Sequence, residues 1–447
     1  MRALLLAAAL AVPAAAQTPA LTLGLREAEA SARAHSLKAR AAAEEAAAAG
    51  DRGDEQFASL LPRVTLDGSY RYQTAVPEFS VLPGAPPRPF GDHRATSIGP
   101  TLSWTLWDQG ALYDAWRAQK ARAASASDLH RLAERQAVLG ARLAYAQAQL
   151  AREQSLALAD ALALADVQDR DIKSRFAAGS ASRIDTLSSR QDALQRRRQF
   201  LQSQADLGAA LRELFQLTGL GAGLDLSRPL DARVSTAAAA GLAAPTLLVT
   251  LDDLRVVPPA LAAAETAPLD PAHPAIAAQA DLADAARRAA AGLQASRGPT
   301  VKLTARASYD YPNGPVLESV TQKTVGLTAS LPLFEGRLTA RAVDEQKRLG
   351  AAAEARRDLA AEELARDWDK ARVALASLRE QLDVDDRSAA DAAELATLVY
   401  RAFKAGSANY LEVQSANLRS LEAKVQAART RAQILIQLAA LASLSQG

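Results

Sequence analysis

Residues that carry acid–base, nucleophilic or metal chemistry are scarce in this chain of 447 residues. It has no cysteine, which excludes disulfides, a thiol nucleophile and lipid attachment through an N-terminal cysteine. The four histidines are far apart and lack the spacing of metal ligands: His35, His93, His130 and His273. No glycine-rich phosphate-binding loop occurs either. The sequence therefore predicts no enzyme, no cofactor and no metal site.

Two carboxylates stand at equivalent places in a repeated stretch. Residues 175–187 read RFAAGSASRIDTL and residues 402–414 read AFKAGSANYLEVQ. Asp185 follows Gly179 by six positions, and Glu412 follows Gly406 by six. If several copies of the chain converge here, the acids form a ring that narrows a mouth and favours cations. Alternatively, each acid stabilises the start of a helix by about 0.3–1 kcal/mol, and the two roles are compatible.

The repeated stretch also predicts two tight turns. Their candidate residues are Phe176, Gly179, Ser180 and Arg183 in the first copy and Phe403, Lys404, Gly406 and Ser407 in the second. Glycine suits the end of one helix, and the small polar residues after it suit the start of the next. The charged residues beside the turns are Arg175, Arg183, Arg401 and Lys404. They either contact a partner protein, pair with the two acids, or are solvated helix charges.

Long helices are expected on both sides of each turn. No proline occurs between Pro100 and Pro229 or after Pro332, although the chain has 20. Since an interior proline costs a helix about 3 kcal/mol, these gaps allow long helices. The runs 108–176 and 335–403, followed by 183–217 and 410–444, have helical spacing of apolar residues. We therefore expect two long antiparallel helical hairpins with tips near 176–183 and 403–410.

Four segments in which apolar and polar residues alternate precede the helical runs. They cover 64–73, 97–107, 301–311 and 324–334, and they predict two β-hairpins over 63–107 and 300–334. Their length and period are those of membrane-spanning strands. A polar, lumen-facing side is expected to carry Asp67, Arg71, Lys302, Arg306 and Asp310. Membrane-interface aromatics are expected at Tyr70, Tyr72, Trp104, Tyr309 and Tyr311. A half-buried soluble hairpin is the alternative.

The whole order of segments occurs twice. Residues 1–16 are expected to be a signal peptide and not a buried helix, because one positive charge and a short apolar run precede small residues. A first repeat then covers 17–217, a linker with short helices and irregular structure covers 218–270, and a second repeat covers 271–447.

The balance of 52 basic and 50 acidic residues argues against nucleic acid as a partner.

Four strands are too few to close a barrel. An open sheet edge in lipid leaves backbone groups unsatisfied at a cost of several kcal/mol each, so several chains must pool their strands. Two chains would give an eight-stranded barrel whose interior is filled by side chains, whereas three chains would give twelve strands. The strand pattern therefore favours three or more copies.

Together these features resemble the outer membrane efflux protein (TolC) family over essentially the whole mature chain. The likeness is carried by TLWDQG at 105–110, by the Phe-x-x-Gly tips, and by LLP at 60–62 and GPT at 298–300. The resemblance implies an α+β membrane protein of the Gram-negative outer membrane. It implies a homotrimer with one shared twelve-stranded transmembrane β-barrel in outer-membrane lipid and a twelve-helix α-barrel tunnel across the periplasm.

Function and partners follow from the same resemblance. It implies a passive, gated exit duct of a tripartite efflux or type I secretion system, with a periplasmic adaptor and an inner-membrane transporter docked at the tips. In that family, acidic residues just past the second tip form the gate, and Glu412 lies there. Ser415 stands where some members have a second acid, so a twin acidic ring is not expected. A periplasmic coiled-coil scaffold or tether without a channel is the alternative function.

Overall fold

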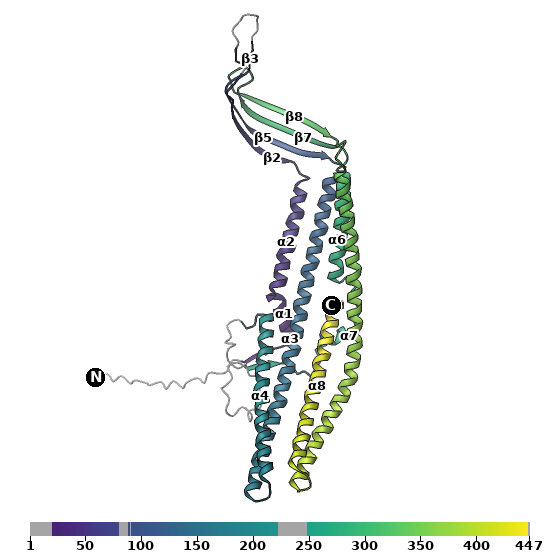
Figure 1. Ribbon diagram of the computed structural model, residues 1–447. Coiled ribbons are helices and arrows are strands. Elements are labelled where there is room, and N and C mark those ends of the chain that lie inside the picture. The colour runs from purple at the N-terminus through teal and green to yellow at the C-terminus, as the bar shows by residue number, and fades with distance from the viewer. Residues whose placement is uncertain (1–19, 80–87, 90, 222–247, 446–447) are drawn as a thin grey trace, which may run out of the picture. The chain divides into compact units, whose positions relative to one another are not determined.

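The computed structural model describes residues 20–79, 88–89, 91–221 and 248–445. The predicted signal peptide lies outside these residues, as does the middle of the predicted linker. The chain divides into two compact units. Unit 1 comprises Met1–Ala39, Glu134–Asp270 and Leu364–Gly447, and unit 2 comprises Arg40–Ala133 and Pro271–Glu363. Two long helices, α3 (Ala111–Ala177) and α7 (Leu338–Lys404), contribute to both units (Figure 1).

Unit 1 contains two helical hairpins. The last part of α3 and α4 (Arg183–Thr218) form the first, and the last part of α7 and α8 (Tyr410–Leu444) form the second (Figure 1). The repeat is exact in these elements, because α7 begins and ends 227 residues after α3, and α8 begins 227 residues after α4. The predicted long helical hairpins are confirmed.

The helices of each hairpin pack through a few larger side chains set among alanines. In the first hairpin, Ala159 and Leu162 of α3 enclose Phe200 of α4, and all three are buried. In the second, the fully buried Thr430 of α8 donates a hydrogen bond of 2.6 Å to Asp385 Oδ2 of α7. Close packing of this kind explains why alanine-rich helices need few aromatic residues to form a core.

A small parallel sheet of unit 1 was not predicted. β1 (Ala20–Leu23) pairs with β6 (Leu248–Leu251), and the short helices α1 (Leu25–His35) and α5 (Pro259–Ala264) follow these strands. The buried Tyr145 of α3 ties the sheet to the long helix. Its hydroxyl donates to Leu23 O and accepts from Asp252 N, both at 2.9 Å. Burial raises the pKa of Tyr145 above its usual value, so the hydroxyl stays protonated.

Unit 2 contains a four-stranded antiparallel sheet in the order β2-β5-β7-β8. The strands are β2 (Arg63–Tyr72), β5 (Arg94–Trp107), β7 (Thr300–Tyr311) and β8 (Val320–Ser330). Each repeat supplies one β-hairpin, and the pairing of β5 with β7 joins the repeats. A two-residue ribbon of β3 (Glu78–Phe79) and β4 (Arg88–Pro89) lies between β2 and β5. Helices α2 (Leu37–Ala58) and α6 (Pro274–Ala295) precede β2 and β7.

The last strand differs from the prediction. β8 ends at Ser330, whereas the alternation predicted a strand to 334. Pro332 explains the difference, because proline lacks the N–H that a ladder requires and restricts the residue before it. Leu333 and Phe334 therefore lie outside the sheet, where they are 90% and 92% exposed.

The corners between sheet and long helix are also equivalent in the two repeats. Asp108 caps α3, because its carboxylate accepts from Gly110 N at 3.0 Å and from Leu112 N at 2.8 Å. Residues 109–110 and 336–337 all have positive φ, between 57° and 86°. The motif TLWDQG thus marks a left-handed corner that turns the chain from the sheet into the helix.

Candidate functional site

Each hairpin tip is closed by the same left-handed turn. In the first tip, Gly179 has φ +73°, Gly179 N donates to Phe176 O at 3.0 Å, and Ser180 N donates to Arg175 O at 2.8 Å. This pair of bonds is a Schellman motif, which satisfies the last carbonyls of α3. The Ser180 hydroxyl adds a third bond, of 3.1 Å, to Arg175 O.

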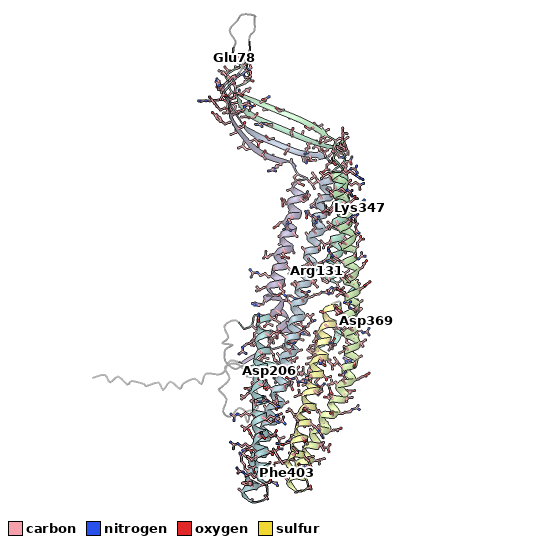
Figure 2. All side chains as sticks on the ribbon, viewed as in Figure 1. Glu78, Arg131, Asp206, Lys347, Asp369 and Phe403 are labelled. Atoms are coloured by element: carbon pink, nitrogen blue, oxygen red, sulfur yellow. The ribbon has the colours of Figure 1, made fainter. Side chains whose placement is uncertain are left out.

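The second tip repeats these bonds. Gly406 has φ +83°, Gly406 N donates to Phe403 O at 3.0 Å, and Ser407 N donates to Ala402 O at 3.0 Å. The Ser407 hydroxyl also donates to Ala402 O, at 3.1 Å. Figure 2 labels Phe403 at this tip. The glycine and serine of each copy therefore build the turn, and Arg183 and Lys404 stand at the adjoining helix ends.

The two candidate gate acids take part in helix caps. Ser182 precedes α4, and its Oγ accepts from Asp185 N at 3.1 Å. Asp185 Oδ2 in turn accepts from Ser182 N at 3.1 Å and from Ser182 Oγ at 2.7 Å. Before α8, Asn409 Oδ1 accepts from Glu412 N, and Asn409 Nδ2 donates to Glu412 Oε1, both at 2.9 Å. Each acid is thus the third residue of its helix and stabilises the N-terminus.

An aromatic cluster joins the two hairpins just behind their tips. Tyr410 of α8 is 1% exposed and packs against Ile172 of α3. The ring of Phe403 lies 5.7 Å from that of Tyr410, and the Arg175 guanidinium lies 5.7 Å from the centre of the Phe403 ring. The cation–π contact connects the first hairpin to the second.

Polar bonds reinforce this contact between the hairpins. Tyr400 OH of α7 donates to Asp171 Oδ2 of α3 at 3.0 Å. Burial, together with this hydrogen bond, raises the pKa of Tyr400 to about 12. Arg175 Nε lies 3.4 Å from Asp171 Oδ2, so the arginine pairs with Asp171 and not with Asp185 or Glu412. Lys404 likewise lies over the ring of Tyr400, at 4.7 Å.

Two amide side chains extend the contact along α8. Gln414 Nε2 donates to Ser188 O at 3.1 Å, and Asn417 Nδ2 donates to Gln168 Oε1 at 3.0 Å. The third candidate gate residue, Ser415, is exposed between them and lines a shallow groove between α4 and α8. The structure therefore brings Ser415 to the border between the hairpins, away from the two capping acids' hydrogen bonds.

The tyrosines of this cluster were not found from the sequence, although a signal was present. At the equivalent positions of the first repeat, Lys173 and Arg183 stand in place of Tyr400 and Tyr410. The two copies differ where the hairpins touch, because each hairpin contributes different side chains to this contact. Positions at which the two copies differ are therefore the sequence signal for this contact.

The sheet places all five predicted lumen residues on one face. Residues opposite each other on neighbouring strands share a face, as do alternate residues of one strand. The opposed pairs are Asp67 with Gly99, Arg71 with Ala95, Thr105 with Lys302, Thr101 with Arg306 and Ser97 with Asp310. Arg306 Nη2 donates to Ser97 Oγ at 2.8 Å, and Ser97 Oγ donates to Asp310 Oδ1 at 2.6 Å. This face carries a connected polar network.

The opposite face carries the predicted aromatics and the large aliphatic side chains. The register puts Tyr70, Tyr72, Trp104, Tyr309 and Tyr311 on this face. Leu66 is 73% exposed, Val325 76% and Leu327 66%. Trp104 Nε1 donates to Leu60 O at 3.0 Å, which satisfies the indole N–H. In this chain the apolar face is uncovered, and a contiguous apolar surface of this kind marks an interaction site.

The described part of the chain has neither a cluster of metal-binding side chains nor a helix that could span a membrane. Among residues 20–79, 88–89, 91–221 and 248–445, no group of histidine and acidic side chains is placed to hold a metal ion. Within the same residues, no helix combines the length and hydropathy needed to cross a membrane.

Solved structures with the same fold include membrane proteins and an outer-membrane channel, by their descriptions. The outer membrane protein VceC from Vibrio cholerae is 16% identical, with a TM-score of 0.72 over 95% of this chain and 96% of VceC. The Campylobacter jejuni CmeC outer membrane channel is 16% identical, with a TM-score of 0.72 over 94% and 86%. A membrane protein from Pseudomonas aeruginosa is 17% identical, with a TM-score of 0.73 over 94% and 93%.

A comparison with curated proteins finds no match. The family described as Outer membrane efflux protein matches residues 28–220 and 272–445, which include both helical hairpins and the sheet. The interruption between the two matched segments falls between the repeats, as an internal duplication requires. The shared fold and the match over most of the sequence agree, and the chain belongs to the outer membrane efflux protein family.

Proposed function

We propose that this protein is the outer-membrane exit duct of a tripartite efflux or type I secretion system, and that it acts as a passive, gated channel. The observation that carries the proposal is the polarity of the sheet. One face exposes Leu66, Val325 and Leu327, and the other carries the Arg306–Ser97–Asp310 network. A wall between lipid and a water-filled lumen needs this division.

The proposed assembly is a homotrimer. The edge strands β2 and β8 each pair on one side only within the chain, and lipid offers no substitute for the missing bonds. Pairing β2 of one chain with β8 of the next closes twelve strands in three chains. The same symmetry brings α3, α4, α7 and α8 of each chain into a tunnel of twelve helices across the periplasm.

The proposed gate lies at the hairpin tips. Three copies of Asp185 and Glu412 would supply six carboxylates near one mouth, with Ser415 three residues further along α8. Their capping bonds support this arrangement, because a carboxylate held by its own cap keeps a fixed position. The turns around Phe176 and Phe403 are proposed contacts for a periplasmic adaptor, which links the duct to an inner-membrane transporter.

Conductance in planar bilayers tests this function. We expect the purified protein to form channels, and Glu412→Ala to raise their conductance. A matched pair tests the sheet: Leu66→Arg on the apolar face should abolish insertion, because an arginine at the lipid face costs about 2–4 kcal/mol, whereas Thr65→Arg on the polar face should be tolerated. Trimers without conductance, even with Glu412→Ala, would favour a scaffold or tether.

A further inference from the structure

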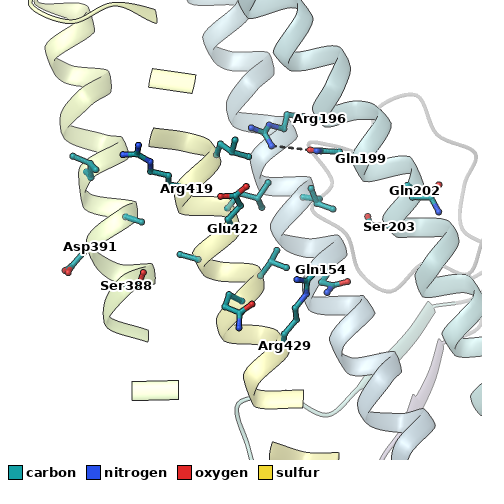
Figure 3. Close-up of a pocket in the computed structure, with 18 of the residues that line it drawn as sticks. Gln154, Arg196, Gln199, Gln202, Ser203, Ser388, Asp391, Arg419, Glu422 and Arg429 are labelled. Atoms are coloured by element: carbon teal, nitrogen blue, oxygen red, sulfur yellow. Dashed lines mark hydrogen bonds between the residues drawn. The ribbon is translucent and has the colours of Figure 1, made fainter. Parts of the chain in front are cut away.

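Unit 1 has a groove between its two hairpins. The residues that line it belong neither to the proposed gate nor to the sheet. The groove is bordered by α3, α4, α7 and α8 and has a volume of about 1420 Å³ (Figure 3). Arg419, on its wall, is seven residues beyond Glu412, or about 10 Å along α8. Pockets for small molecules usually measure about 300–1,000 Å³, so the groove is large enough for an elongated ligand.

The groove carries uncompensated positive charge. Its charged lining consists of Arg196, Arg198, Arg387, Arg419 and Arg429, against Asp206, Asp391 and Glu422. Arg198, Arg387, Arg419 and Arg429 form no ion pair within 4.0 Å with any residue that the structure describes. The excess of arginine over carboxylate therefore remains available to a ligand.

Arg196 is a fixed part of this lining. It is 5% exposed, Arg196 Nε lies 3.4 Å from Asp192 Oδ1, and Arg196 Nη1 donates to Gln199 Oε1 at 3.2 Å (Figure 3). A buried guanidinium that is held by two partners keeps its orientation without a ligand. Its charge is balanced by Asp192, so the charge available to a ligand comes from the exposed arginines.

Apolar side chains lie between the arginines. Val384 is 64% exposed, Leu395 43% and Leu418 40%, and all three line the groove. Leu158, Leu421 and Val425 complete the apolar part. Exposed aliphatic side chains gain about 25 cal/mol for each Å² of apolar surface that a ligand covers. The lining therefore suits a ligand with an apolar body as well as a negative charge.

We propose that this groove binds a small amphipathic anion, with a carboxylate, sulfate or phosphate head and an apolar body. Arginine recognises such heads with paired hydrogen bonds, and the aliphatic side chains cover the body. The three carboxylates disfavour a dense polyanion, which would meet them along its length. This site goes beyond the exit duct, because its occupancy can be measured whether or not the protein conducts.

Calorimetric titration with 2-naphthalenesulfonate tests the proposal. The protein is the full mature chain in nanodiscs of zwitterionic lipid, and empty nanodiscs provide the baseline. We expect saturable binding of one ligand per chain. Arg419→Gln together with Arg429→Gln should weaken it by about tenfold or more, since a hydrogen bond to a charged group contributes about 1.5–3 kcal/mol. Leu395→Gln should weaken it as well.

The control variant is Arg366→Gln, because Arg366 is an exposed arginine of the same unit that does not line the groove. It should bind like the unchanged protein. Inorganic sulfate and 2-naphthalenemethanol test the two halves of the ligand, and each should bind more weakly than 2-naphthalenesulfonate. The proposal is overturned by absence of saturable binding, by equal losses in the Arg366 and groove variants, or by equal affinity for either half-ligand.

Discussion

The Tyr400 hydroxyl donates a 3.0 Å hydrogen bond to Asp171 Oδ2 and so links the second helical hairpin to the first. The two residues are not equivalent in the repeat, since Leu398 corresponds to Asp171 and Lys173 to Tyr400. The bond lies beside the Phe403–Tyr410 ring contact and the Arg175 cation–π contact. Hairpins with equivalent turns are thus held together by side chains that the two copies do not share.

Removing this hydroxyl should loosen the tips. Tyr400→Phe deletes the hydrogen bond to Asp171 and keeps the ring. We therefore expect the free energy of unfolding to fall by about 1 kcal/mol and amide hydrogen exchange in residues 405–412 to become faster. Mass spectrometry after deuterium labelling measures this exchange. Tyr113→Phe is the control, because the Tyr113 hydroxyl is exposed and makes no hydrogen bond within the part of the chain described. Unchanged exchange in Tyr400→Phe would show that the bond does not restrain the tips.

The same bond predicts a pH dependence. Because folding raises the pKa of Tyr400 from about 10 to about 12, the protonated hydroxyl is favoured in the folded protein. The contribution of the protonated hydroxyl to stability is fully present below pH 10 and is lost as the pH rises through about 12. The difference in Tm between the unchanged protein and Tyr400→Phe should therefore be constant from pH 6 to 9 and shrink above pH 10. Circular dichroism melts follow it, and a difference that already varies between pH 6 and 9 would contradict this assignment.

The capping and gating roles of the tip acids can be separated. Glu412→Gln removes the charge but keeps an oxygen that can accept from Asn409 Nδ2. We expect it to reduce cation selectivity and to lower the Tm only slightly, because the charge contributes about 0.3–1 kcal/mol at the helix N-terminus. Asn409→Ala removes the cap but keeps the charge, so it should destabilise α8 by about 1 kcal/mol and keep the selectivity.

Reversal potentials in planar bilayers and thermal melts provide the two readouts. Asp185→Asn and Ser182→Ala form the corresponding pair in the first hairpin. If the charge-removing variants change stability and not selectivity, the acids are caps only.

The helices and strands were predictable because their signals are local. A proline-free run with helical spacing is sufficient for α7, and a glycine before small polar residues is sufficient for the tips. The alternation of apolar and polar residues likewise assigned the side chains of β2 and β7 to the two faces of the sheet. The alternation of residues 324–334 does not show the end of β8, because Pro332 stops the strand within a pattern that continues unbroken.

The contacts between distant segments were not predictable in the same way. β1 and β6 have four residues each and are separated by more than two hundred, so neither carries a recognisable period. Tyr145, which ties them to α3, sits in an ordinary helical pattern. In the sequence, the groove arginines cannot be distinguished from solvated helix charges, because their convergence depends on the packing of four helices.

Substitution of the tip glycines should destabilise the protein because of their backbone conformation alone. A Cβ at Gly179 or Gly406 would meet no atom within 4 Å, but both residues have positive φ. Replacement by alanine is therefore expected to cost about 1–2 kcal/mol through backbone strain. Gly140→Ala is the matched control in the interior of α3, where its Cβ would also be in open space, and it should stabilise by about 0.5–1 kcal/mol. Thermal melts of the three variants check this, and a stabilised Gly406→Ala would contradict the left-handed turn.

Gly99 tests the pairing that joins the two repeats in the sheet. A Cβ at Gly99 of β5 would lie 1.9 Å from Ala307 O and 2.6 Å from Ser308 Cα of β7, so the backbone of one strand would have to move. Gly68 in β2 is the control, because its nearest neighbour, Ile98 Cγ1, is 4.0 Å away. We expect Gly99→Ala to lose about 1–3 kcal/mol and to reduce the amount of protein that assembles in outer-membrane fractions. Gly68→Ala should assemble normally, since alanine costs a strand less than glycine does. Equal assembly of the two variants would mean that β5 and β7 do not approach each other as closely as this register requires.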